Sequence, residues 1–231
     1  MPRRSNGGFL AKPEGQVLDA LVTRVPAGIG PDALTAIGIL GAMLASLGFA
    51  MSLTTSASLF LVVLGLGLNW LGDSLDGRIA RHRRIERRIE GFILDNGVDL
   101  VSYLLLAIGF ALSDLVSFAI PFILLALYTL LSNLSLARML VTGVHDLAID
   151  GVGTSELRVG FLGLAVILFL FPDMFRSMLP LLEISVLDGL SLLWAAIMLA
   201  NFTLVLRRDI RLAHQADQRN AAQMEMEGLR D

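Results

Sequence analysis

The chain has 231 residues, of which 55% are hydrophobic and 17% are charged, and it carries a formal net charge of -3. An average soluble domain has about 25% charged residues, so this composition excludes an ordinary soluble domain and indicates a polytopic membrane protein. The absence of cysteine excludes disulfides and thiolate metal sites.

The N-terminal segment lacks the long apolar core of a signal peptide, and we expect no cleavage there. Residues 10–25 mix apolar and charged side chains in a way that suits an amphipathic helix lying at the membrane interface. The alternative is the start of an ordinary soluble helix. Pro26 and Pro31 then interrupt the chain, and Pro31 is well placed to begin the first membrane span.

The apolar runs predict an all-α polytopic membrane protein that forms a single domain across residues 1–231. Residues 1–31 would be an interfacial segment, and residues 207–231 a cytosolic tail. We expect six transmembrane helices, at 33–51, 57–80, 91–112, 115–140, 158–178 and 186–206.

The basic residues indicate the orientation of the spans. Of the 18 Lys and Arg residues, all except Arg176 fall in segments that this topology places on one side. Because basic loops stay in the cytoplasm, both termini and the loop at 81–90 should face the cytoplasm. We therefore expect a multi-pass protein of the cell (inner) membrane.

Four aspartates interrupt the second and third spans near that loop. Asp73 and Asp76 stand three residues apart, and Asp95 and Asp99 four residues apart, so each pair lies on one face of its helix. Carboxylates near hydrocarbon are costly and indicate a functional site. If the two helices pack together, the four carboxylates should converge.

Such a set of oxygen ligands suits a hard cation, Mg2+ or Mn2+, rather than zinc. Four acids are enough for two ions about 4 Å apart, an arrangement that suits phosphoryl transfer. The ions would neutralise a pyrophosphate, and a spare carboxylate would accept the proton of an attacking hydroxyl.

Small residues share these helical faces. Gly77 and Ala80 lie beside the first aspartates, and Gly91 precedes the second pair, so they would leave room for a ligand between the helices. The alternative is close helix packing. Among the five arginines of the loop at 81–90, we expect Arg81 to be the one nearest to bound phosphates, and the others to set topology.

These positions resemble the signature of the CDP-alcohol phosphatidyltransferase family (class I). The signature is DG, two residues, AR, a gap, and then G, D and D at intervals of four, with a further aspartate three residues before the DG. The matching residues here are Asp73, Asp76, Gly77, Ala80, Arg81, Gly91, Asp95 and Asp99. The gap from Arg81 to Gly91 holds nine residues, slightly more than is usual, and PDALT at the start of the first span is similar to the family's PNxLT.

The resemblance implies a homodimer that transfers a phosphatidyl or related group from a CDP-linked donor to an alcohol and releases CMP. Asp73, Asp76 and Asp95 would be metal ligands, and Asp99 would be the general base and a fourth ligand. The nucleotide would contact Gly77, Ala80, Arg81 and Gly91. CDP-diacylglycerol is the expected donor in phospholipid biosynthesis, membrane lipids are expected partners, and no nucleic-acid partner is expected.

The acceptor alcohol stays open. Parts of the chain are similar to phosphatidylserine synthases and phosphatidylcholine synthases, and neither likeness is complete. Arg138, Glu156 and Arg158 lie on the cytoplasmic side and are candidates for binding the acceptor or its phosphate. Surface ion pairs are the alternative for each. Asn69 and Asn133 lie inside spans and are expected to hydrogen-bond between helices.

Two other functions remain as alternatives. The first is a CDP-choline or CDP-ethanolamine type of phosphotransferase that acts on diacylglycerol. The second, more distant, is an ion-coupled transporter with carboxylates along its pathway. A transporter would need polar groups at mid-membrane in several helices, whereas these acids cluster near one face.

Overall fold

The computed structural model describes the backbone of residues 3–5, 11–142, 144–146, 154–179 and 184–228, and most of the side chains within those ranges. In these ranges the chain forms eight helices and four very short strands. The helices are α1 Ala11–Val22, α2 Pro31–Ala50, α3 Ser56–His82, α4 Arg88–Ala111, α5 Ala119–Thr142, α6 Thr154–Leu170, α7 Pro172–Arg176 and α8 Val186–Gly228. The predicted all-α fold is confirmed.

The strands are minor additions that the sequence did not predict. β1, Arg3–Ser5, pairs in parallel with β2, Val144–Asp146, and so ties the N-terminal segment to the chain that follows α5. β3, Met178–Leu179, pairs antiparallel with β4, Ile184–Ser185, just before α8.

Five helices in the described part of the chain are long and apolar enough to cross a membrane, namely Pro31–Ala50, Ser56–His82, Arg88–Ala111, Ala119–Val141 and Val186–Gln215. Many of their large apolar side chains are exposed, among them Leu40, Phe60 and Leu193, as expected of surfaces that face lipid.

The predicted fifth span, 158–178, differs from the structure. Its 17-residue helix α6 ends at Leu170, and at 1.5 Å per residue it is about 25 Å long, shorter than the roughly 30 Å hydrocarbon core. The chain turns at Phe171 because Pro172 has no amide hydrogen and restricts the residue before it. Pro172 then starts the short helix α7.

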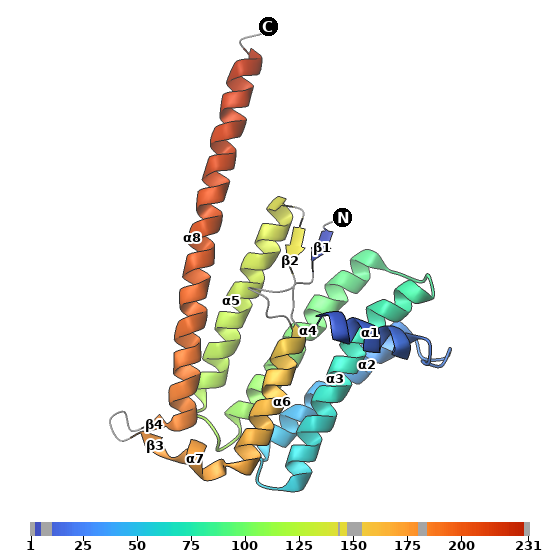
Figure 1. Ribbon diagram of the computed structural model, residues 1–231, viewed down its shortest axis with the longest axis vertical. Helices are drawn as coiled ribbons and strands as arrows, with labels where there is room; N and C mark the ends of the chain where they lie inside the picture. The colour runs from blue at the N-terminus through green and yellow to red at the C-terminus, as the bar shows by residue number, and fades with distance from the viewer. Residues whose placement is uncertain (1–2, 6–10, 143, 147–153, 180–183, 229–231) are drawn as a thin grey trace.

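The helices α2, α3 and α4 form the compact part of the bundle (Figure 1). Glycines let α2 and α3 approach closely, since a Cβ atom on Gly41 would lie 2.4 Å from the backbone nitrogen of Asn69. The rings of Phe49 on α2 and Phe110 on α4 stack with their centroids 4.0 Å apart. Helix α6 packs on α3, and α8 packs on α5 and continues far beyond it.

Helix α1 lies across the end of α3 that leads into the loop at 81–90 (Figure 1). It buries Leu18 and Val22 in a small core with Leu75 and Ile79. At its N-terminal end, Glu14 accepts a hydrogen bond of 2.8 Å from the indole nitrogen of Trp70. Within the predicted segment 10–25, Ala11–Val22 are helical, with one face packed on the bundle, while a position at the membrane interface stays a prediction.

Candidate active site

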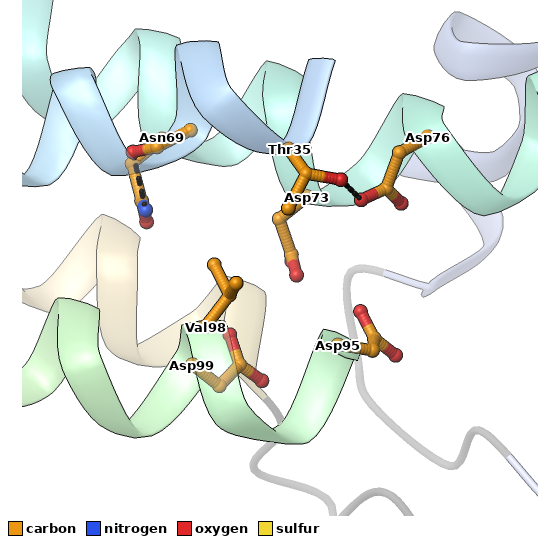
Figure 2. Close-up of a pocket in the computed structure, with 8 residues that line it drawn as sticks. Thr35, Asn69, Asp73, Asp76, Asp95, Val98 and Asp99 are labelled. Carbon is orange, nitrogen blue, oxygen red and sulfur yellow. Dashed lines mark hydrogen bonds between the residues drawn. The ribbon is translucent and has the colours of Figure 1, made fainter. Parts of the chain in front are cut away.

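The four aspartates line one pocket between α2, α3 and α4 (Figure 2). Asp73 and Asp76 come from α3, and Asp95 and Asp99 from α4. The pocket is completed by Thr35, Gly38, Asn69 and Val98. The prediction that the two aspartate pairs converge is thus confirmed.

Helix spacing and close packing explain this convergence. Residues three or four apart share a helical face, so each helix presents its two carboxylates to the same side. Helix α2 can form the third wall because glycines occupy the crossing: a Cβ atom on Gly72 would lie 2.4 Å from the carbonyl oxygen of Leu34 and 2.5 Å from the nitrogen of Gly38.

Thr35 fixes the orientation of one carboxylate. Its hydroxyl lies 2.7 Å from Oδ2 of Asp76 and 3.2 Å from the carbonyl oxygen of Pro31. A hydroxyl has a single hydrogen, and the shorter contact to the charged acceptor is the stronger one. Figure 2 shows Asp76 turned toward Thr35, whereas Asp73 points toward α4.

Arg158 enters the site from α6. Its Nη1 donates to Oδ2 of Asp73 over 2.8 Å, and its Nη2 lies 3.5 Å from Oδ1 of Asp99. Its side chain is only 6% exposed, against 18% for Asp73 and 26% for Asp99. A buried guanidinium needs such partners because an unpaired charge is costly away from water.

Asn69 also binds the guanidinium of Arg158. Its Oδ1 accepts a hydrogen bond of 2.9 Å from Nε of Arg158. Its Nδ2 donates to the carbonyl oxygen of Gly38 over 3.0 Å and to Oγ of Ser102 over 3.2 Å. The prediction that Asn69 hydrogen-bonds between helices is confirmed. Asn133, by contrast, has an exposed side chain on α5.

The chemical type of the four aspartate side chains suits a hard divalent cation. All four side chains are carboxylates, and carboxylate oxygens are the ligands that Mg2+ and Mn2+ prefer. As they are arranged, however, no three acidic or histidine side chains in the described ranges lie close enough to hold one ion. Binding would require the carboxylates to turn toward a common point.

The residues predicted to contact a nucleotide lie along the same ends of α3 and α4. A Cβ atom on Gly77 would approach only the guanidinium of Arg81, at 3.5 Å, and one on Gly91 would meet no described atom within 4 Å. Close helix packing therefore does not account for these two glycines. Ala80 is half-buried, and Arg81 is exposed.

The remaining candidates for acceptor binding are placed differently. Arg138 on α5 donates from Nε and Nη2 to Oδ2 of Asp209 on α8, over 3.0 and 2.7 Å. Arg158 forms ion pairs with two of the aspartates, Asp73 and Asp99. Glu156 belongs to the start of α6, and its side chain lies outside the described residues.

Sequence reasoning assigned no role to Thr35 or Ser102, although both are buried and connected to the site. The signal for Thr35 was present in PDALT at the start of the first span. Ser102 offered none beyond being a small polar residue three positions after Asp99.

The family model for CDP-alcohol phosphatidyltransferase matches residues 29–206, about three quarters of the chain. The chain belongs to the CDP-alcohol phosphatidyltransferase family. A search of curated proteins found no match. The matched region begins just before α2 and ends within α8, so it includes every wall of the aspartate pocket.

Membership in the CDP-alcohol phosphatidyltransferase family makes the chain an enzyme that uses a CDP-alcohol and an alcohol acceptor in the transfer of a phosphatidyl group. The family generally depends on divalent metal ions. Together with five apolar helices of membrane-spanning length, this describes a multi-pass membrane transferase.

Proposed function

We propose that this enzyme transfers a phosphatidyl group from CDP-diacylglycerol to the hydroxyl of a small alcohol, releasing CMP, in phospholipid biosynthesis. The acceptor oxygen forms a bond to the phosphorus that carries the diacylglycerol. The bond from that phosphorus to the oxygen of CMP breaks, and the acceptor's proton passes to a carboxylate. The observation that supports this reaction best is the single pocket lined by Asp73, Asp76, Asp95 and Asp99.

We assign Asp73, Asp76, Asp95 and Asp99 as the residues that hold divalent cations, Mg2+ or Mn2+, with two ions proposed. When bound, such ions neutralise the negative charge of the two phosphates and of the departing CMP. Thr35 supports this role because its hydrogen bond keeps Asp76 in a fixed orientation.

We assign Asp99 as the general base. Its contact with Arg158 is 3.5 Å long, against 2.8 Å for Asp73, and its side chain is 26% exposed. Asp99 is therefore the less tightly held of the two carboxylates that face Arg158, and the better placed to take a proton from an incoming hydroxyl.

The nucleotide is proposed to bind along Gly77, Ala80, Arg81 and Gly91. The surroundings of the two glycines support this assignment, since a Cβ atom on Gly91 would meet no described atom within 4 Å and one on Gly77 would meet only the guanidinium of Arg81. The side chain of Arg81 makes no hydrogen bond or ion pair with the described residues, so its guanidinium is available to a phosphate.

Arg158 is our first candidate for contacting the acceptor, because it already lies beside Asp73 and Asp99. Arg138 and Glu156 remain candidates at the same end of the bundle. An acceptor that carries a phosphate would suit these arginines best.

We also propose six membrane passes, with α6 and α7 together making the fifth. Strand β1 near the N-terminus and the C-terminal end of α8 lie toward the same end of the bundle (Figure 1), as an even number of passes requires. In this topology α1 lies at the cytoplasmic interface of the cell membrane, and the active site and both termini are cytoplasmic. The whole chain forms one domain, and two copies form a homodimer.

An acceptor screen tests the reaction. Purified protein in detergent is supplied with radiolabelled CDP-diacylglycerol, Mg2+ or Mn2+, and one acceptor at a time: serine, inositol phosphate, glycerol phosphate or choline. We expect a labelled lipid with one acceptor and an equal amount of CMP. Labelled lipid that forms equally well in excess chelator would contradict the metal role.

Asp99→Asn tests the base, with Asp114→Asn as the control. Asp114 is exposed in the turn after α4 and does not line the pocket. We expect Asp99→Asn to abolish turnover with an unchanged elution profile and helical content, and Asp114→Asn to keep it. Full turnover by Asp99→Asn would exclude Asp99 as the base.

Two alternatives are separated by the same assays. If no acceptor yields lipid from CDP-diacylglycerol, product from CDP-choline or CDP-ethanolamine and diacylglycerol would identify the other type of CDP-alcohol transferase. Cation flux in liposomes without nucleotide would indicate a transporter, a reading that family membership disfavours.

A further inference from the structure

The guanidinium of Arg158 occupies a position between carboxylates that a cation would also occupy. Each of its three nitrogens faces a different acceptor: Nε faces Asn69 at 2.9 Å, Nη1 faces Asp73 at 2.8 Å, and Nη2 faces Asp99 at 3.5 Å. A planar guanidinium that spans α3 and α4 in this way links the two aspartate pairs.

A network of buried side chains holds Arg158 in this position. Both donors of the Asn69 amide are used, by the carbonyl oxygen of Gly38 and by Ser102, which leaves the amide oxygen facing Arg158. Taken as whole residues, Asn69 is 4% exposed, Ser102 is 3% exposed and Arg158 is 5% exposed. A network buried to this degree holds the side chain in one place.

Arg158 and a divalent cation would compete for the same carboxylates. Oδ2 of Asp73 already accepts the Nη1 hydrogen, and a cation bound at Asp73 and Asp99 would lie close to a fixed positive group that repels it. The pocket has almost no free volume for a water-sized molecule, and no three of the described acids are close enough to share an ion.

We propose that Arg158 is the internal counter-cation of the aspartate pocket. It holds Asp73 and Asp99 in position while no divalent cation is bound, and its guanidinium must leave Asp73 for the cation to be fully coordinated. This inference rests on the proposed function, in which the aspartates bind a divalent cation. It makes Arg158 a positioning residue whose ion pairs lower the affinity of the pocket for metal.

Metal affinity is the decisive measurement. Free Mn2+ is titrated with purified full-length protein in detergent and followed by electron paramagnetic resonance, for the wild type, Arg158→Gln, Arg158→Lys and the control Arg138→Gln. Because Arg138 pairs with Asp209 on α8, its variant removes an interhelical arginine of the same membrane face without touching the pocket contacts of Arg158.

We expect Arg158→Gln to bind Mn2+ roughly tenfold more tightly or better, the change that follows from losing charged hydrogen bonds that compete with metal. Arg158→Lys should be intermediate, because a lysine cannot face three partners at once. Arg138→Gln should match the wild type. A purely structural role for Arg158 would instead weaken Mn2+ binding when it is replaced.

Thermal unfolding gives a second readout. Without metal, Arg158→Gln should unfold at a lower temperature than the wild type, because it leaves buried carboxylates unpaired. Added Mn2+ should raise the unfolding temperature of Arg158→Gln by more than that of the wild type. If Arg158→Gln does not fold, Arg158→Lys carries both measurements.

The outcomes separate the two proposals. If the wild type binds Mn2+ and the Arg158 variants bind it equally or less tightly, the counter-cation role is overturned while the metal site stands. If neither the wild type nor the variants bind Mn2+, the metal site itself is wrong, and the counter-cation role falls with it.

Discussion

The hydroxyl of Thr35 on α2 lies 2.7 Å from Oδ2 of Asp76 on α3, across a separation of 41 residues in the chain. Thr35 is 7% exposed, so water does not readily replace this hydrogen bond. One side chain of α2 thus fixes the direction of a carboxylate that belongs to the signature of the family.

Thr35→Val should preserve the shape of this side chain and remove the hydrogen bond. We expect a loss of stability of about 1 to 3 kcal/mol, typical of a hydrogen bond to a charged group, and a higher Mn2+ or Mg2+ concentration for half-maximal turnover. Thermal unfolding and a metal titration of activity measure the two effects.

Thr129→Val is the matched control for Thr35→Val. The Thr129 hydroxyl donates only to the carbonyl oxygen of Leu125, at 2.8 Å, on an exposed face of α5. Thr129→Val should change neither the stability nor the metal concentration for half-maximal turnover. An unchanged metal requirement in Thr35→Val would show that Asp76 keeps its orientation without Thr35.

Gly72→Ala should separate α2 from α3. The added Cβ would lie 2.4 Å from the carbonyl oxygen of Leu34, which is backbone and cannot move aside. We expect a destabilisation of about 1 to 3 kcal/mol, as for other overpacked sites. Gly67→Ala on the same helix meets nothing within 4 Å and should be neutral or stabilising by up to about 1 kcal/mol. Equal unfolding temperatures for the two variants would contradict the close crossing.

Gly91→Leu tests the proposed nucleotide surface. No described atom lies within 4 Å of a Cβ at Gly91 or at Gly97, so leucine at either position should leave the fold intact. If the nucleotide passes along Gly91, Gly91→Leu should raise the KM for the CDP-linked donor about tenfold, equivalent to about 1.4 kcal/mol of binding. Gly97→Leu should leave this KM unchanged, and equal KM values in both variants would remove Gly91 from the nucleotide site.

The ion pair between Arg138 and Asp209 can be tested from both sides, because its two variants should change the acceptor KM differently. If Arg138 binds an anionic acceptor, Arg138→Gln should raise the acceptor KM several-fold. Asp209→Asn should leave that KM unchanged or lower it, since a competing carboxylate is removed. Both side chains are partly exposed, at 31% and 21%, so each variant should cost about 1 kcal/mol or less of stability. Parallel changes in both variants would mean that the pair only joins α5 to α8.

The amino-acid sequence by itself determined the local features of the site. The spacing of Asp73, Asp76, Asp95 and Asp99 depends only on the periodicity of a helix, and periodicity can be read without knowing which helices touch. The apolar runs likewise predicted most of the helices, since span length follows from bilayer thickness. Pro172 could have indicated the end of α6, but the apolar residues on both sides of it made the predicted span look continuous.

Only the tertiary structure decided which partners those carboxylates have. Arg158 lies 85 residues from Asp73, and nothing in the pattern of α6 indicates that this arginine reaches α3. In a membrane protein, core and lipid are both apolar, so the hydrophobic pattern of a span does not reveal which face packs inward. That choice depends on shape, as in the glycine crossing of α2 and α3, and on buried polar groups such as Asn69 that find partners only when the helices are assembled.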